Sequence, residues 1–437
     1  MEELLHAIVL FVGPNLYWIG PLISLFAVFG AYRQGQRRRQ IQGLPTSKVK
    51  GVFIGFVELY GQLRCDAPRT SYLAEIECAY YRYAVYEHWE KTETYRDSDG
   101  RTKTRKSSGW SEVDSRTAMV RFDLEDETGR IRVNPQGAEI EAPEIFSQTV
   151  GMGHPLYYGK GPMHSIPHST HRRRFVEYAL RPGFLVFVLG QSRERDDRVE
   201  PEIAFHPDSP RFLISHRTEA QIVTGHRWQE AGFAFLALLL AIGLPAWQIY
   251  SPELADPFPI EWLLAYALGM AGVFMLSGSI GVYNSLVEIY QRVRQGESLI
   301  DVQLKRRFDL ITNLVQTVRH MQRHEANLLE RLTELRGSIT DHDGQPVARQ
   351  LIALAESYPD LKSNRAFLGL QKELIDTEDR IALARRYYVE CRSNFMTMCE
   401  KWPNLYIARL GRFRSPEPLD FDPGEFERPN VVFSQVE

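Results

Sequence analysis

Residues 283–315 read YNSLVEIYQRVRQGESLIDVQLKRRFDLITNLV and begin at the end of an apolar segment. Within this stretch apolar residues recur at steps of four, three and four: Leu304, Phe308, Ile311 and Val315. Such spacing is typical of the apolar seam of a helix that pairs with another helix. No proline interrupts residues 262–335. The stretch therefore predicts one continuous helix that starts in the apolar segment and leaves it as an amphipathic helix.

Three segments of the chain are apolar and carry no Asp, Glu, Lys or Arg: Ala7–Tyr32, Ala231–Tyr250 and Trp262–Tyr283. A helix needs about 20 such residues to cross a bilayer. The first follows two acids, whereas a cleaved signal peptide starts with bases and has a shorter apolar run, so we expect a retained helix. The sequence predicts a multi-pass membrane protein of the α+β class with three transmembrane helices, at residues 1–32, 231–250 and 262–283.

The placement of charge suggests an orientation for these segments. Arg37, Arg38 and Arg39 follow the first one, the loop between the second and third carries acids only, and bases follow the third, beginning with Arg292. Bases gather on the cytoplasmic side of membrane proteins. We expect a plasma-membrane protein with its N-terminus outside and both large polar segments in the cytoplasm. The three arginines are expected to contact lipid headgroups.

Composition narrows the class of protein further. The net charge of -3 argues against binding of a polyanion by the whole chain, and no nucleic-acid partner is expected. The four cysteines, Cys65, Cys78, Cys391 and Cys399, include no C-x-x-C pair. They fit a reducing compartment with buried free thiols, although a bridge between Cys65 and Cys78 stays open.

Residues 33–230 have the texture of a β-rich domain. Short runs of β-branched and aromatic residues alternate with turn sequences such as Asp99-Gly100 and Pro182-Gly183. Regularly spaced short strands favour an antiparallel barrel or sandwich. A helix is expected from Ala142 towards Val150.

Several pieces of this segment carry a family resemblance. They include Cys78 followed by Tyr80-Tyr81-Arg82, the run from Phe122 to Gly129, and the run from Arg174 to Tyr178. The segment resembles the GIDE domain, also called BAM, which in eukaryotic ubiquitin ligases lies between two membrane spans and precedes a RING. A RING needs about eight Cys or His ligands in C-x2-C-type spacing. This chain has no such pair, so the resemblance does not imply ligase activity here.

The segment from residue 284 to 400 resembles the LemA family of membrane-anchored helical proteins. The positions that carry the resemblance are Asn284, Asp301, Lys305, Arg306, Arg307, Asn313, His324, Glu325 and Arg385, and Glu378 also matches. Together with a second seam from Phe367 to Met398 and a shorter helix near residues 346–357, the pattern predicts an antiparallel helical bundle. Residues 401–437 are expected to form an irregular tail that departs from the family.

Two histidine groups invite a metal-binding interpretation. His164, His168 and His171 lie in a proline-containing loop without a nearby acid or cysteine, which favours a surface loop over a metal site. His320 and His324 stand one helical turn apart, but no H-E-x-x-H motif follows, which favours a polar stripe on the helix. We expect no cofactor, no metal and no small-molecule substrate.

The function that these observations favour is a non-catalytic scaffold or signalling protein at the membrane. It would act through assembly of its GIDE-like and LemA-like domains, as a homo-oligomer or with a heterologous membrane protein, and in contact with membrane lipids. One alternative is an enzyme or enzyme subunit related to E3 ubiquitin ligases. Another is a lipid-binding protein that organises the membrane.

Overall fold

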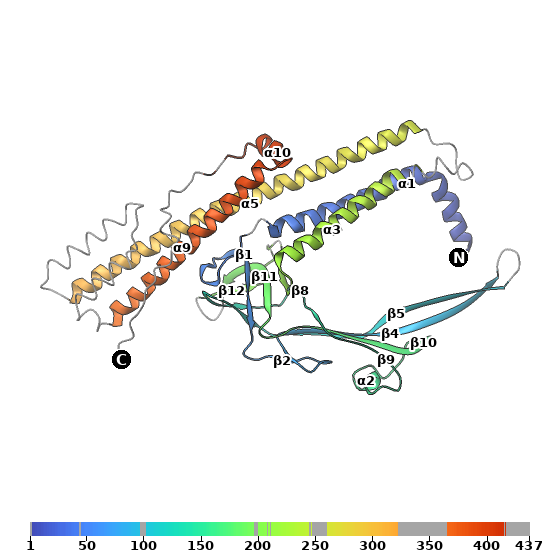
Figure 1. The fold of residues 1–437 in the computed structure, drawn as a ribbon, viewed down its shortest axis with the longest axis horizontal. Helices are drawn as coiled ribbons and strands as arrows, with labels where there is room; N and C mark the ends of the chain where they lie inside the picture. The colour runs from blue at the N-terminus through green and yellow to red at the C-terminus, as the bar shows by residue number, and fades with distance from the viewer. Residues whose placement is uncertain are drawn as a thin grey trace. The chain divides into compact units, whose positions relative to one another are not determined.

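The computed structural model describes residues 2–42, 45–96, 102–195, 200–207, 209, 211–243, 246, 260–321, 365–414 and 416 of the chain. These residues form two compact units. The β unit comprises residues 46–218, and the helical unit comprises residues 1–45 together with residues 219–437. The strands expected within residues 33–230 belong to the β unit (Figure 1).

The larger sheet of the β unit closes into a barrel-like ring. Its strands lie in the order β1 (Gly55–Arg64), β6 (Phe122–Asp126), β7 (Gly129–Val133), β12 (Pro201–Ala204), β11 (Leu185–Glu194), β13 (Leu213–Ser215) and β8 (Glu139–Glu141). A further antiparallel pairing of β1 with β11 closes the ring. Closure leaves β1 and β11 paired on both sides, which removes two sheet edges that would otherwise be exposed.

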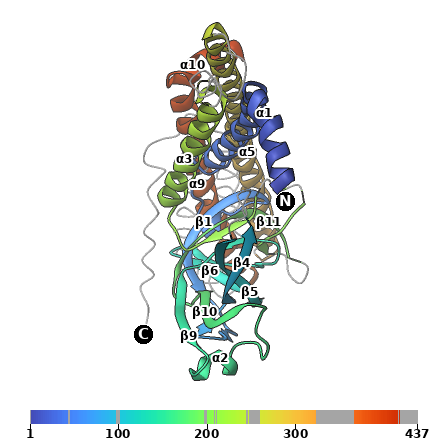
Figure 2. The same ribbon diagram turned by 90° about the vertical axis from the view of Figure 1, so that its right-hand side faces the viewer.

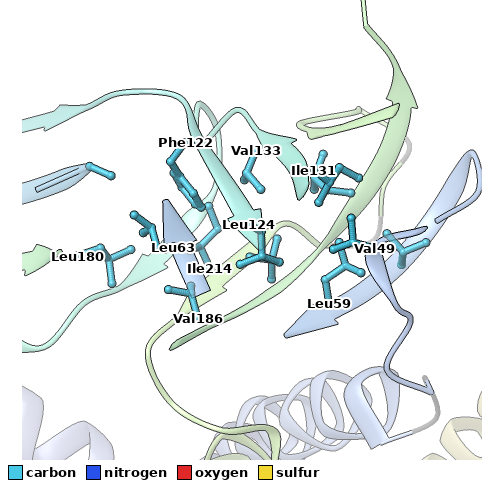
Figure 3. Packing of buried hydrophobic residues seen from close by; sticks show 14 of the residues in the cluster. Val49, Leu59, Leu63, Phe122, Leu124, Ile131, Val133, Leu180, Val186 and Ile214 are labelled. Atoms are coloured by element: carbon cyan, nitrogen blue, oxygen red, sulfur yellow. The ribbon is translucent and has the colours of Figure 1, made fainter. Parts of the chain in front are cut away.

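The core of the β unit fills this ring. Leu59, Leu63, Leu124, Val133 and Val186 are buried and point towards one another (Figure 3). Leu63, Leu124 and Val133 alternate with more exposed neighbours, as strands with one buried face require. The strand β11 is instead buried continuously from Val186 to Gly190. The short helix η1 (Val49–Gly51) adds its valine to the same cluster. At Gly61 a Cβ would lie 2.6 Å from the backbone oxygen of Glu125 in the neighbouring strand β6, so this close approach requires glycine.

A second sheet has the order β5 (Thr102–Met119), β4 (Tyr80–Arg96), β10 (Ser169–Leu180) and β9 (Glu144–Gly151). The strands β4 and β5 pair along their whole length, and their outer parts extend beyond β10 as a two-stranded ribbon (Figure 1). The helix α2 (Pro155–Gly159) lies at the end of this sheet beside β9 (Figure 2). A small ribbon of β2 (Arg69–Thr70) and β3 (Glu77–Cys78) completes the unit.

The helical unit contains two side-by-side helix pairs (Figure 1). The first consists of α1 (Glu2–Gln42) and α3 (Glu219–Leu238), which continues as the π-helix η2 (Leu239–Gly243). The second consists of α5 (Ile260–Met321) and α9 (Arg365–Glu400), followed by α10 (Asn404–Leu410). As expected, α5 is one uninterrupted helix from the apolar segment into the amphipathic stretch.

The prediction of three transmembrane helices is wrong. Among the residues that the structure describes, one helix is long and apolar enough to cross a membrane, from Leu264 to Leu314 within α5. A segment without charges can still be covered by neighbouring helices. Ala27 of α1 is buried in one cluster with Ala237 of α3 and Met270 of α5, so helix packing uses part of the apolar surface. The predicted orientation of the chain assumed three membrane crossings, so it is no longer supported.

The predicted helical bundle is also wrong for the described part of the chain, where α9 pairs with α5 alone, apart from the short α10. The third helix expected at residues 346–357 lies outside the described residues. Two local predictions change as well. The segment expected to become a helix at Ala142 forms the strand β9 because it pairs with β10. The tail expected to be irregular begins with the helix α10.

Candidate functional site

The interface between α5 and α9 is the first candidate site, because it joins two segments that carry the LemA-like pattern. The helices run antiparallel: the rings of Tyr290 and Phe395 lie 5.5 Å apart, and Arg307 meets Glu378 further along. At Gly296 a Cβ would lie 3.2 Å from Cα of Tyr388, so the backbones approach closely there. The two helices therefore pack with little space between them.

A buried ion pair crosses this interface. Nε of Arg307 lies 2.8 Å from Oε1 of Glu378, and only 7% and 14% of the two side chains are exposed. The angle between these atoms does not meet hydrogen-bond geometry, so the contact is ionic. Removing charges from water costs several kcal/mol per ion, which a partner of opposite charge offsets. The pair therefore favours the one register of α9 along α5 in which the two charges meet.

The other described residues of the LemA-like pattern are spread along α5 and α9. Arg385 is half-buried, whereas the remaining described members are exposed: Asn284, Asp301, Lys305, Arg306 and Asn313. His324 and Glu325 lie outside the described residues. The helix seam differs from the one expected, because Phe308 is 39% exposed while Arg307 is buried. A search for apolar periodicity misses this seam, since it counts an arginine as a surface residue.

Cys391 of α9 lies in the same unit and is fully buried. Burial raises the pKa of its thiol to about 12. In the β unit burial likewise raises the pKa of Cys78 to about 11. All four cysteines are free thiols, so the bridge between Cys65 and Cys78 does not form. A thiol with such a pKa carries almost no thiolate at neutral pH and is a poor nucleophile.

The apolar part of α5 has a strongly exposed surface. Leu264, Leu268, Met275 and Leu276 are 67%, 65%, 75% and 64% exposed. Exposed apolar patches of this kind mark contacts with a membrane or another protein. Positions 269, 272 and 278 on the same helix are glycines, and no atom lies within 4 Å of the place where their Cβ would be. This part of α5 is therefore open along much of its length.

The basic cluster after the first apolar segment lies inside the helical unit. Nε of Arg38 donates to Oε2 of Glu230 in α3 at 2.9 Å. The guanidinium of Arg39 lies against Gly281 of α5, where a Cβ would clash with it. Arg37 is half-buried. Two of the three arginines expected to contact lipid headgroups thus also contact neighbouring helices.

Sequence reasoning missed a second ion pair, in the β unit. Arg173 and Glu87 are both fully buried, and Nη2 of Arg173 lies 3.0 Å from Oε2 of Glu87. Arg173 also donates to the backbone oxygens of Tyr157, Pro162 and His164. Burial raises the pKa of Glu87, but hydrogen bonds from Ser169 and Arg173 outweigh it and leave this pKa below its usual value. The pair holds the loop that carries α2 against the sheet.

A third buried carboxylate holds another loop. Glu177 accepts hydrogen bonds from the hydroxyl of Ser71 and from the backbone amides of Tyr72, Leu73 and Ala74. These contacts, like those of Arg173, bind backbone groups of the protein itself. The buried charges of the β unit thus stabilise loops. Glu177 lies in the family-like run from Arg174 to Tyr178, but periodicity does not mark any of these charges as buried, because an isolated Glu or Arg in a strand usually lies on the exposed face.

The first histidine group, His164, His168 and His171, does not gather into a metal site, and the second group, His320 and His324, reaches beyond the described residues. Among the residues that the structure describes, no group of three His, Cys, Asp or Glu side chains is placed to hold a metal ion. His164 contributes its backbone oxygen to Arg173. His168 and His171 each adopt a left-handed backbone conformation, with φ of 60° and 55°.

Two known protein families match parts of this chain. Residues 90–246 match the GIDE family model, described as E3 Ubiquitin ligase, and residues 296–433 match the LemA family model. The chain carries a GIDE domain and a LemA domain. The GIDE match starts within β4 and reaches past η2. The LemA match starts inside α5 and extends through α10, beyond the point where the sequence suggested a departure from the family.

A curated relative supports the same assignment. The chain is 22% identical to the Magnetosome protein MamQ of Magnetospirillum gryphiswaldense over 204 residues, which cover 38% of this chain and 75% of that protein. MamQ is a LemA-family protein. The LemA family is not an enzymatic family. Together the families and the relative point to a bacterial protein associated with a membrane.

Proposed function

We propose that this protein is a non-catalytic scaffold anchored in a bacterial plasma membrane. The observation that carries the proposal is the continuity of α5. Its exposed apolar part from Leu264 suits a bilayer, and the same helix continues to Met321 as one half of the α5–α9 pair. A force or displacement at the pair is therefore transmitted to the anchor. One relative, MamQ of Magnetospirillum gryphiswaldense, is named a magnetosome protein.

We propose further that the GIDE domain of this chain has no ligase activity of its own. A RING that recruits a ubiquitin carrier needs about eight zinc ligands in closely spaced pairs. The chain has four cysteines without a C-x-x-C pair. The buried charges Glu87, Arg173 and Glu177 bind loops of the β unit, and this use leaves them poorly placed to act on a substrate. A protein-binding role for the β unit fits these features better.

The LemA domain is proposed to face the cytoplasm. The acids at positions 253, 256 and 261 precede the apolar part of α5, and Arg292 and Arg294 follow it. This asymmetry follows the rule that bases stay on the cytoplasmic side. We also propose that the exposed apolar side chains of α5 contact lipid acyl chains. In the cytoplasm the exposed surface of the α5–α9 pair then meets a second copy of the chain.

Photo-crosslinking in native membranes tests the scaffold proposal. A crosslinking amino acid at Val389, which is 41% exposed on α9, should give an adduct at about twice the chain mass of 50.4 kDa that contains this chain alone. The same group at Leu374, buried on the same helix, should give no such adduct. An adduct with a different membrane protein would replace self-assembly by a heterologous partner. The absence of any adduct at Val389 would contradict assembly through this surface.

An activity assay tests the non-catalytic part of the proposal. The purified chain, supplied with ubiquitin-activating and ubiquitin-conjugating enzymes, should form no conjugates and contain far less than one zinc per chain. A chain with an added RING from an active ligase is the positive control. Conjugates formed by the chain itself would favour the E3-related alternative.

A further inference from the structure

The segment around α10 presents an apolar surface to the outside. Trp402, in the turn before the helix, is 79% exposed, and Tyr406 and Leu410, one turn apart on α10, are 64% and 87% exposed. Ala408, on the opposite side of the helix, is buried. Large apolar side chains exposed to water are unfavourable relative to burial, so a folded chain seldom retains such a group without a partner.

The charges within residues 401–414 have a single sign, although the exposed Glu400 directly precedes them. Between residues 401 and 414 the chain carries four bases and no acid: Lys401, Arg409, Arg412 and Arg414. All four are exposed. Arg409 lies one residue before Leu410, so positive charge directly borders the apolar side chains. An apolar stripe bordered by bases is typical of helices that lie in the headgroup region of an anionic membrane.

The structure fixes where along α5 this segment lies. A Cβ at Gly411 would be 3.1 Å from the ring of Tyr283, and the ring of Phe413 lies 5.6 Å from the same ring. Phe413 also packs against Phe395 of α9, with the ring centroids 6.1 Å apart. Figure 1 shows α10 beside α5 and the end of α9. These contacts hold α10 at the level of Tyr283.

Tyr283 ends the apolar segment of α5, since the polar residues Asn284 and Ser285 follow it. The 22 residues from Trp262 to Tyr283 span roughly 33 Å at about 1.5 Å per residue, close to the thickness of a hydrocarbon core of ~30 Å. A bilayer that covers this segment has its headgroups at the level of Tyr283. That is the level at which α10 is held.

We infer that the outer surface of α10, formed by Trp402, Tyr406 and Leu410, inserts into the headgroup region of an anionic membrane beside the point where α5 leaves it. This inference rests on the proposed membrane insertion of α5. Trp and Tyr are enriched at that depth because their rings are apolar and their N–H and O–H groups stay hydrated. The four bases match anionic headgroups, whereas a second copy would bring its own four bases against them. The inference makes α10 a second contact that fixes the tilt and depth of the α5–α9 pair.

Depth-dependent fluorescence quenching tests the inference in the full chain. A fluorophore is attached to Leu410→Cys, to Met275→Cys in the exposed apolar part of α5, or to Leu368→Cys at the far end of α9, where the side chain is 44% exposed. The partly exposed cysteines at positions 65 and 399 are replaced by serine, and the two buried ones stay. Each protein is reconstituted in vesicles of phosphatidylglycerol and phosphatidylcholine.

The label at position 410 should be quenched by lipids with a nitroxide near the headgroup and protected from a water-soluble quencher. The label at 275 should respond to a nitroxide deep in the acyl chain, and the label at 368 to the aqueous quencher alone. If 410 behaves like 368 while 275 reports deep lipid, the inference fails and the proposed anchor stands. If 275 also behaves like 368, the proposed anchor itself fails.

A charge variant separates lipid from other partners. Replacing Arg409 and Arg412 by glutamine should lower the equilibrium constant for surface contact by roughly fivefold per residue, since one base near an anionic surface contributes about 1 kcal/mol. The loss should appear in anionic vesicles and vanish in phosphatidylcholine alone. A label at 410 that is shielded equally in both vesicles, with no quenching by lipid nitroxides, would show that protein covers α10 and would overturn the inference.

Discussion

The buried pair of Arg307 and Glu378 gives the sharpest quantitative prediction. Replacing Arg307 by methionine removes the cation that lies 2.8 Å from the Glu378 carboxylate, whose side chain is 14% exposed. Methionine keeps much of the length of the side chain and has a good helix propensity, so the change isolates the loss of charge. We expect α9 to dock less firmly on α5.

The magnitude follows from the burial of both partners. Breaking a buried ion pair costs about 3–5 kcal/mol because it leaves one charge uncompensated. Here both side chains keep a little exposure and the contact lacks hydrogen-bond alignment, so we expect the lower end, about 3 kcal/mol. Replacing both residues by methionine removes the stranded charge and should cost less than about 1 kcal/mol. The two single changes are therefore strongly non-additive.

Cys391 offers a built-in reporter for this experiment. Its thiol is fully buried in α9 and has a pKa raised to about 12, so it reacts with a maleimide only when the helix pair opens. A loss of about 3 kcal/mol raises the open population, and with it the alkylation rate, by roughly 150-fold. Mass spectrometry of the peptide that contains Cys391 measures the rate. Cys78, buried in the β unit, is the internal control and should not change.

A surface pair on the same helix is the matched control. Arg386 and Glu390 form an ion pair one turn apart, with 63% and 39% of their side chains exposed. Such pairs contribute about 0.3–0.5 kcal/mol, so Arg386→Met should change the rate by about twofold. The reasoning is refuted if Arg307→Met changes the rate no more than Arg386→Met. It is also refuted if the double variant of the buried pair opens as readily as the Arg307 variant.

Two further predictions concern packing and pH. Gly296→Leu should lower the free energy of unfolding of the helix pair by about 1–3 kcal/mol, because a Cβ there meets the backbone of Tyr388. Gly369→Leu in α9, where no atom lies within 4 Å of the Cβ position, should raise this free energy by up to about 1 kcal/mol. Equal shifts of the melting temperature in the two variants would contradict this. The pKa of Glu87 is lowered in the folded chain, so its ionised carboxylate stabilises the β unit. This stabilisation is complete above the usual carboxyl pKa of 4.5 and is lost as the pH falls through the lowered pKa. The melting temperature of the β unit should drop in wild type as the pH falls below 4.5, and Glu87→Gln should start lower and vary less; parallel curves would argue against this role.

The strands and the long helix were predictable because their signals are local. The run from Val52 to Glu58 and the run from Phe184 to Leu189 alternate or cluster as half-buried strands do, and they contribute to β1 and β11. The ring that these strands close through the β1–β11 pairing joins residues more than 120 positions apart. Periodicity carries no information on such partners. Ala142 to Val150 was misread because its pairing with β10, and not its own composition, decides its structure.

In the helical unit, the sequence pattern did not reveal which helices pack against one another. Uncharged length predicts three crossings, yet burial of Ala27 and Ala237 depends on contacts between helices that are far apart in the sequence. The same holds for the candidate site. Arg307 and Glu378 could each be recognised in the family-like pattern, but the contact between them requires α9 to fold back along α5. The seam was predicted one residue away, at Phe308, because apolar side chains alone were assumed to face the partner helix.

We propose that α5 is one rigid connection between the membrane and the α5–α9 pair. Spin labels at Leu276 and Val302, both exposed on α5, test it most directly. The 26 residues that separate them predict a backbone separation of about 39 Å at 1.5 Å per residue. In nanodiscs the pulsed electron resonance distance should lie near that value with a narrow distribution, and Val287→Pro should broaden it by kinking the helix. A broad or much shorter distance in the chain without the proline would contradict the account.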